Sequence, residues 1–166
     1  MSTSGRPKFL YHFSENPSIE RFVPHLAPTS SSDEALVWAI DADNSYLYYF
    51  PRDCPRVIFT KSSRTSAQDA KRFFLHTTAK TIAAIESHWL DRLRDTTIYR
   101  YTLPSDGFEL RDGPAGYWVS TDEVLPRDVE PIPDLMNALV EEGVELRIMA
   151  SLSDLLDAVV ASSLAF

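Results

Sequence analysis

Short runs of aromatic and β-branched residues set the strongest limit on what this chain can fold into. Such runs are typical of strands, and Pro, Gly, Asp or Asn bounds most of those found here. We expect strands at Phe9–Phe13, Leu36–Ile40, Arg56–Thr60, Thr81–Ile85, Ile98–Leu103, Phe108–Leu110, Tyr117–Ser120 and Val144–Met149. The chain has only five glycines and no glycine-rich phosphate loop, which argues against a doubly wound nucleotide-binding fold.

Short helices are expected between these strands. Asn44–Phe50 follows Asp43 as N-cap and stops before Pro51, and Ala67–Leu75 follows the N-cap Ser66. A third helix is expected at His88–Arg94 after Ser87. Asp69 occupies the capping-box position of the second helix.

Two further helices are expected near the C-terminus. Pro133 opens the first and Gly143 closes it, whereas Ser151 caps the second. The apolar faces expected to be buried comprise Leu135, Met136, Leu139 and Val140 in the first helix, and Leu152, Leu155, Leu156, Val159 and Val160 in the second. Together these elements predict an α+β fold, with a mixed, largely antiparallel sheet and short surrounding helices.

The length of 166 residues suits a single domain over 1–166 with one sizeable core. We expect residues 1–8 to form a flexible N-terminus and Pro24–Glu34, rich in Pro and Ser, to form a surface loop. The lone cysteine, Cys54, the polar N-terminus and the lack of an apolar run of ~20 residues favour a cytoplasmic location without membrane insertion.

The net charge of −8 is unevenly distributed. Residues 103–166 contain three Lys or Arg and 13 Asp or Glu. Such an acidic segment repels nucleic acid, so nucleic acid is a poor expectation for a partner.

His12 is the first candidate for a functional residue. It lies in an otherwise aromatic strand, and Ser14 points to the same face because strand side chains alternate. One interpretation is a half-buried histidine bonded to a backbone carbonyl, and the other is a donor directed at a ligand hydroxyl.

Aromatic residues form the second candidate group. Trp38 lies in the strand before Tyr46, Tyr48 and Tyr49. These rings could belong to the core or could stack against a flat ligand ring. Taken alone, the segment favours the core.

Other chemistry has little support in the sequence. Arg52 and Arg56 lie near Cys54 and could lower its pKa, but there is no local base, so a structural cysteine is favoured. No pair of His or Cys has metal-ligand spacing, so no metal site is expected. The basic segment from Arg52 to Arg72 is expected to be a solvated face, although it is the one region that could receive phosphates.

Nearly the whole chain resembles an uncharacterised family of bacterial domains of unknown function. The resemblance lies in the segments LYHFSENPSIERFVP, LVWAID and FPRDCPRVIFTK. It brings no known activity.

A second resemblance is to the His-Tyr-Glu class of ADP-ribosyltransferase folds. Three segments carry it: His12-Phe13-Ser14, the strand ending at Asp41 with its tyrosine-bearing helix, and Glu123-Val124-Leu125-Pro126. Phe13 replaces a usual glycine and Trp38 a usual tyrosine. Asp122 or Glu130 could take the place of Glu123.

This resemblance implies an NAD-using transferase or glycohydrolase that cleaves the nicotinamide glycosidic bond. His12 would position the adenosine-side ribose, and Glu123 would stabilise the charge that develops on the other ribose. The NAD-binding residues implied are His12, Phe13, Ser14, Trp38, Tyr48 and Tyr49, with Trp38 and Tyr49 stacking on nicotinamide.

Two alternatives remain open from the sequence. One is a non-enzymatic module on the same fold that binds another small molecule or a protein. The other is an NAD-independent isomerase, cyclase or hydrolase that uses His12 and a carboxylate as acid and base. The acceptor of any transfer and the oligomeric state are not encoded in a recognisable pattern.

Overall fold

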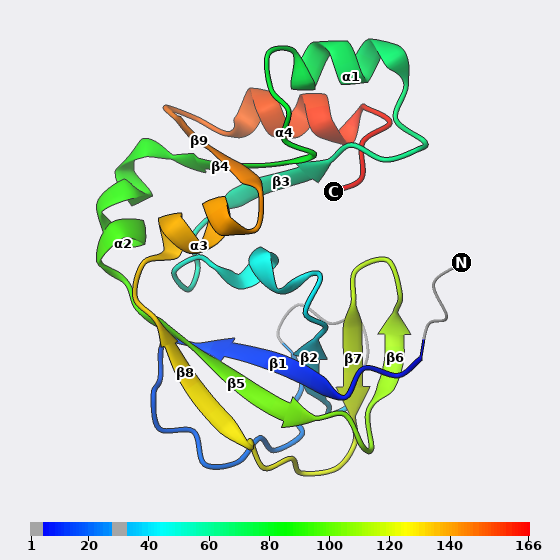
Figure 1. Ribbon diagram of the computed structural model, residues 1–166, viewed down its shortest axis with the longest axis vertical. Coiled ribbons are helices and arrows are strands. Elements are labelled where there is room, and N and C mark those ends of the chain that lie inside the picture. The colour runs from blue at the N-terminus through cyan, green and yellow to red at the C-terminus, as the bar shows by residue number, and fades with distance from the viewer. Residues whose placement is uncertain (1–4, 28–32) are drawn as a thin grey trace. The chain divides into compact units, whose positions relative to one another are not determined.

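The structure of this α+β protein is a computed structural model that describes residues 5–27 and 33–166 (Figure 1). The chain forms two compact units, each built from two separate stretches of sequence. Unit 1 comprises Met1–Tyr48 and Ile98–Ile132, and unit 2 comprises Tyr49–Thr97 and Pro133–Phe166.

Unit 1 contains a six-stranded sheet with the strand order β6-β7-β2-β1-β5-β8. The strands are β1 (Phe9–Ser14), β2 (Val37–Ile40), β5 (Ile98–Pro104), β6 (Glu109–Asp112), β7 (Tyr117–Ser120) and β8 (Asp128–Ile132). All neighbouring strands are antiparallel. β1 pairs with β5 along its whole length, but its register with β2 consists of the single pair Tyr11↔Ile40.

One face of this sheet forms the core of unit 1. Its buried side chains are Leu10, Phe22, Val37, Ala39, Tyr101, Leu103, Phe108 and Val124. Phe22 and Val124 come from loops and pair with each other through an isolated antiparallel bridge. Because strand side chains alternate, Tyr11 and Phe13 project from the opposite face to Leu10.

Unit 2 contains a three-stranded sheet with the order β3-β4-β9. β3 (Arg56–Thr60) is antiparallel to β4 (Thr81–Glu86), and β4 is parallel to β9 (Val144–Met149). The four central residues of β4, Ile82–Ile85, are fully buried, as expected for a central strand covered on both faces.

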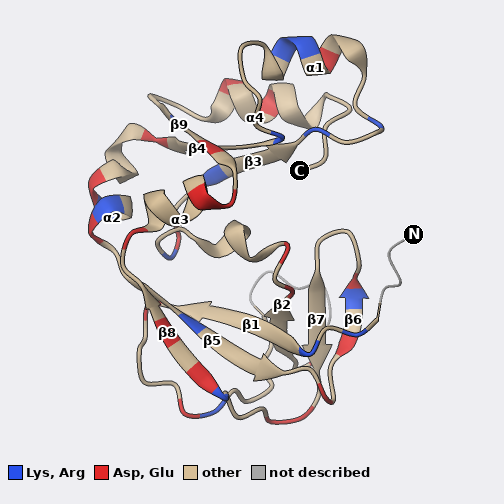
Figure 2. Cartoon of the chain, viewed as in Figure 1, with Lys and Arg blue, Asp and Glu red and all other residues tan. Residues whose placement is uncertain are grey.

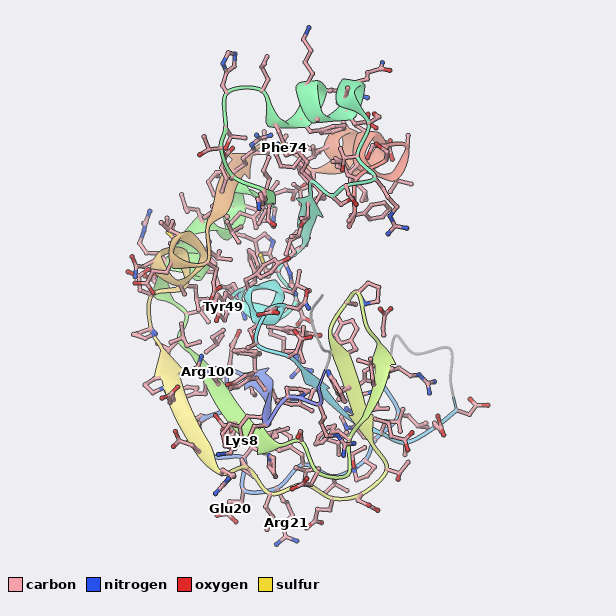
Figure 3. The ribbon with its side chains drawn as sticks, turned by 45° about the vertical axis from the view of Figure 1, so that its right-hand side comes forward. Lys8, Glu20, Arg21, Tyr49, Phe74 and Arg100 are labelled. Atoms are coloured by element: carbon pink, nitrogen blue, oxygen red, sulfur yellow. The ribbon has the colours of Figure 1, made fainter. Side chains whose placement is uncertain are left out.

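Four α-helices surround this sheet: α1 (Ala67–Phe74), α2 (Leu90–Asp95), α3 (Leu135–Glu141) and α4 (Ser153–Val160). Two 3₁₀ turns, η1 (Ser45–Tyr48) in unit 1 and η2 (Ser87–Trp89) in unit 2, complete the described elements. Phe59, Phe73, Phe74 (labelled in Figure 3), Leu152 and Val159 form the centre of one core cluster.

The last residues of the chain belong to unit 2. Leu164 is buried in the cluster around Phe59, and Ala165 pairs with Thr60 of β3 through backbone hydrogen bonds in both directions. Asp69 of α1 accepts hydrogen bonds from both the backbone N–H and the hydroxyl of Ser163. The end of the chain is thus fixed to β3 and α1.

The expected strands all form, with shifts of one or two residues at their ends. β8 was not expected. Four helix starts were wrong. Asp41, not Asp43, accepts from the N–H of Asn44, and a 3₁₀ turn over Ser45–Tyr48 replaces the helix expected to reach Phe50.

The other three wrong starts lie in unit 2. The α-helix expected at His88–Arg94 begins only at Leu90, because Ser87–Trp89 form the 3₁₀ turn η2. Asp134 caps α3 in place of an opening at Pro133, and α4 begins at Ser153 after Leu152 rather than after Ser151. Ser66 does cap α1, and Gly143 ends the segment after α3 with a φ of 73°.

The buried helix faces are narrower than expected. Val140, Leu156 and Val160, which were expected inside, are exposed at 64%, 45% and 57%. Of the expected loop Pro24–Glu34, residues 28–32 lie outside the described residues, as do residues 1–4 of the expected flexible N-terminus. None of the helices in the described part of the chain has the length and apolar character that crossing a bilayer would require.

Candidate functional site

His12 lies on the core face of the unit 1 sheet, the face of Leu10. Its Nδ1 is 3.2 Å from the backbone carbonyl of Trp38, which is in the part of β2 beyond the single β1–β2 pair. Its ring is 4.6 Å from that of Phe22, centroid to centroid. The histidine therefore bridges the two strands where their register ends.

The environment of His12 favours its neutral form. Burial lowers its pKa below the ordinary value, the hydrogen bond to the Trp38 carbonyl opposes this shift, and His25 contributes a further lowering. With Nδ1–H donated to Trp38, the neutral imidazole has a fixed tautomer.

Glu123 faces away from this core. Its carboxylate is 3.1 Å from the guanidinium of Arg21, and both side chains are well exposed. Arg21 projects outward from unit 1 (Figure 3). The neighbouring residues Phe22 and Val124 point inward, and the ring of Phe22 is the one that contacts His12.

The two acidic residues considered as alternatives to Glu123 have other partners. Glu130 on β8 forms an ion pair with Arg100 of β5, whose guanidinium lies 5.2 Å from the ring centroid of Tyr11. Asp122 is exposed, and its backbone N–H donates to the hydroxyl of Ser120. The hydroxyl of Ser14 accepts from the N–H of Asn16 in the turn after β1.

The aromatic candidates gather on the opposite face of the sheet. The rings of Phe13 and Tyr48 are stacked, with centroids 5.9 Å apart and planes 6° from parallel. The hydroxyl of Tyr48 donates to that of Tyr117 at 3.1 Å. Tyr117 in turn meets Trp38 edge to face, at 6.0 Å and 86°. We call Phe13, Tyr48, Tyr117 and Trp38 the aromatic row.

All four side chains of the aromatic row are partly exposed. The pairing of β2 with β7 assembles part of it, because Tyr117 lies opposite Ile40 and Val119 lies opposite Trp38. Residues directly opposite each other in an antiparallel pair project to the same face. Tyr117 was not singled out from the sequence. Its position two residues before Val119 in the strand could have indicated that the two side chains project from the same face.

The turn that carries Tyr48 is held by a compact polar network. The carboxylate of Asp41 accepts from the backbone and side-chain N–H groups of Asn44, and the hydroxyl of Ser45 donates to the Asp41 carbonyl. The backbone N–H of Asp41 donates to the carbonyl of Gly116. This network joins the start of η1 to the strand that bears Tyr117.

Tyr49, the remaining ring candidate, belongs to unit 2 and is only 4% exposed (labelled in Figure 3). Cys54 is also buried in unit 2. Burial raises the pKa of its thiol, more than Arg56 and Arg92 lower it. The thiol is therefore held neutral, in agreement with a structural cysteine and not with a nucleophile.

The cationic segment of unit 2 packs over aromatic rings. Arg56 lies over Phe50, Lys61 over Phe74 and Arg72 over Phe73. Within residues 5–27 and 33–166, no group of three His, Cys, Asp or Glu side chains is placed to hold a metal ion.

Comparison with known proteins places the sequence in a family. A family model described as a family of unknown function, DUF6886, matches residues 11–166. The chain belongs to the DUF6886 family. This agrees with the resemblance seen in the sequence to an uncharacterised domain family. No curated protein and no solved structure gives a significant match to this DUF6886 protein.

Proposed function

We propose that this DUF6886 protein binds a small molecule that carries a planar ring, and that the aromatic row of unit 1 holds the ring. The observation that supports this function is the connected set of four partly exposed aromatic side chains on the sheet face opposite the core. Aromatic side chains with a few polar groups are typical of small-molecule sites.

The geometry also favours a particular mode of stacking. A ring placed between Phe13 and Tyr48 would need two van der Waals separations of about 3.5 Å each, which is more than their 5.9 Å centroid distance allows. A ligand ring would therefore stack on an outer aromatic surface. The Tyr48–Tyr117 hydroxyl pair would offer it a polar contact.

Binding without bond cleavage is the form of this proposal that the geometry supports best. His12 uses Nδ1 to bridge β1 and β2, and Glu123 is in an ion pair with Arg21. His12 contacts the buried ring of Phe22, whereas the Glu123 carboxylate is exposed. NAD cleavage by these two residues would require both to leave their present partners.

NAD and nicotinamide are nevertheless the first ligands to test, because the motif resemblance implies them. We expect saturation-transfer NMR to detect nicotinamide or NAD at millimolar concentration. Trp38→Leu should abolish the signal. Trp89→Leu is the matched control, since Trp89 is also a partly exposed tryptophan but lies in η2 of unit 2.

Two results would contradict the proposal. One is a folded wild-type protein that gives no transfer from any ring-bearing probe, and the other is equal loss in the two tryptophan variants. Release of nicotinamide from NAD in the same samples, abolished by Glu123→Gln at an unchanged melting temperature, would favour the glycohydrolase hypothesis instead.

A further inference from the structure

We infer that the ligand ring is a cation, of the N-alkylated aromatic class. This inference rests on the proposed function and specifies the charge of the molecule that the aromatic row accepts. The part of the row that supports it is the corner formed by Trp38 and Tyr117, whose ring planes are 86° apart. Two rings at right angles leave two aromatic faces that one ligand can contact, and these electron-rich faces, unlike the electron-poor ring edges, attract cations.

Two carboxylates share the sheet face with this corner. Asp112 of β6 lies opposite Tyr117 in the β6–β7 register, after a register shift between Leu110 and Asp112. Glu109 lies opposite Val119, which is itself opposite Trp38. Neighbouring strands are about 4.8 Å apart, so Asp112 is one strand from Tyr117 and Glu109 is two strands from Trp38.

Three other carboxylates near the sheet are already paired with arginines. Glu123, Glu130 and Glu34 form ion pairs with Arg21, Arg100 and Arg111. In the described part of the chain, no ion pair involves Asp112 or Glu109, although Asp112 accepts from the N–H of Ala115. Their charge is thus available to a cation at the corner.

The charge of the whole unit acts in the same direction. Unit 1 contains six Lys or Arg and 13 Asp or Glu, a formal net charge of −7, whereas unit 2, with ten and 11, is at −1 (Figure 2). An excess of one sign raises the local concentration of the opposite ion. A cationic ligand would be attracted to unit 1, and an anionic one repelled.

Within the protein itself, the same sheet face already has a cation over an aromatic ring. The Arg100 guanidinium lies over Tyr11 and is paired with Glu130. An aromatic surface, a cation and a carboxylate thus occur together on this face within the protein itself. The Trp38–Tyr117 corner with Asp112 supplies the surface and the carboxylate, and the ligand would supply the cation.

The test compares two probes of one shape in the full-length protein. 1-Methylnicotinamide is a cation, and 3-methylbenzamide is its neutral counterpart. We expect calorimetry at low ionic strength to give the cation about tenfold higher affinity, the order of magnitude of a partly desolvated cation–π contact with a nearby charge. Added salt should lower the affinity for the cation and leave the affinity for the neutral probe unchanged.

Carboxylate variants localise the effect. Asp112→Asn and Glu109→Gln should each lower the affinity for the cation several-fold without changing that for 3-methylbenzamide. Glu123→Gln is the matched control, because it removes one negative charge of unit 1 that is already paired, and it should change neither affinity. Glu109 is exposed and forms no ion pair within the described part of the chain, so Glu109→Gln remains informative even if Asp112→Asn is unstable.

The outcomes separate the two proposals. Equal affinity for both probes, or an equal effect of Glu123→Gln, would overturn the cationic class while the ring-binding function stands. Binding of neither probe would contradict ring binding itself, and the cationic inference with it.

Discussion

At the scale of single residues, His12 illustrates how a residue type that suggests catalysis can be structural. A histidine in an aromatic strand was open to both interpretations, because the sequence does not show where the imidazole nitrogens point. The structure directs Nδ1 to the Trp38 carbonyl and the ring to Phe22. The deciding contact comes from a strand 26 residues further on, and a local pattern does not encode it.

The stability of a His12→Ala variant tests this structural role. Removing the imidazole leaves a cavity beside Phe22 and deprives the Trp38 carbonyl of its partner, at a cost of roughly 1–3 kcal/mol. For a chain of this length we expect the melting temperature to fall by about 2–4 °C per kcal/mol. Differential scanning fluorimetry measures this shift. His88→Ala, at a side chain that is 67% exposed, should change it little, and equal shifts in the two variants would show that His12 is not a packing residue.

A pH dependence follows from the lowered pKa of His12. The unfolded histidine takes up a proton near pH 6.5, whereas the folded one resists protonation until lower pH. The free energy of unfolding is therefore not reduced by His12 above about pH 6.5, and it falls as the pH drops toward the pKa of the folded state. Below that pKa, His12 causes no further loss. Urea unfolding between pH 7.5 and 5 should show this decline in the wild type. The decline should be smaller in His12→Gln, and an identical slope in both would assign it to other groups.

At the scale of elements, the sequence predicts strands well where they are apolar and fails where they are not. β8 (DVEPI) contains two acidic residues and a proline, and four of its five residues are exposed. It is an edge strand that exists because it pairs with β5, and prolines and charges are the usual residues of such edges. No local apolar pattern could have indicated it.

The aromatic row was only partly predictable for the same reason. Phe13, Trp38 and Tyr48 were among the residues that the resemblance implied for NAD binding. Tyr117, which contacts both Trp38 and Tyr48, comes from β7 and was not singled out. The β2–β7 pairing that brings Tyr117 to Trp38 spans about 80 residues of sequence. Residue type suggested the chemistry, whereas only the strand order assembled the surface.

Gly116 lets β7 approach the turn after β2, and its replacement tests that packing. A Cβ at Gly116 would lie 2.4 Å from the side-chain amide of Asn44 and 2.6 Å from each carboxylate oxygen of Asp41. Both side chains are fixed by hydrogen bonds, so Gly116→Ala should break the network that carries Tyr48. We expect a loss of about 3 kcal/mol from backbone strain and broken hydrogen bonds together.

Gly143 provides a control for the strain alone. Its φ of 73° matches the 71° of Gly116, but a Cβ there would meet nothing within 4 Å. Gly143→Ala should therefore cost only the ~1–2 kcal/mol of a left-handed alanine. Chemical denaturation of both variants gives the comparison. A loss at Gly116 no larger than that at Gly143 would mean that the side chains of Asp41 and Asn44 move aside at little cost.

At the scale of the whole molecule, each unit has its own core, and each core can be weakened separately. Leu10 is fully buried in unit 1 and Phe59 is fully buried in unit 2. Truncating either to alanine should cost about 2–5 kcal/mol. Hydrogen exchange with mass spectrometry should then show faster exchange in β1, β2 and β5 for Leu10→Ala, and in β3, β4 and β9 for Phe59→Ala. Uniform acceleration in both variants would indicate that the chain opens only as one cooperative whole.

The interleaving of the two units along the chain has a consequence for biosynthesis. β3 and β4 leave the ribosome long before their partners in unit 2. β4 pairs with the later strand β9, and β3 is covered by Leu164 and paired with Ala165 near the end of the sequence. The sheet of unit 1 is likewise incomplete until β8, the partner of β5, has been synthesised. The nascent chain must therefore expose β4 (TIAAIE), whose four central residues are fully buried in the folded protein, while some 60 further residues up to β9 are translated. Such a delay favours aggregation of nascent chains at high expression, and slower synthesis at low temperature or a co-expressed holdase chaperone should raise the yield of folded protein.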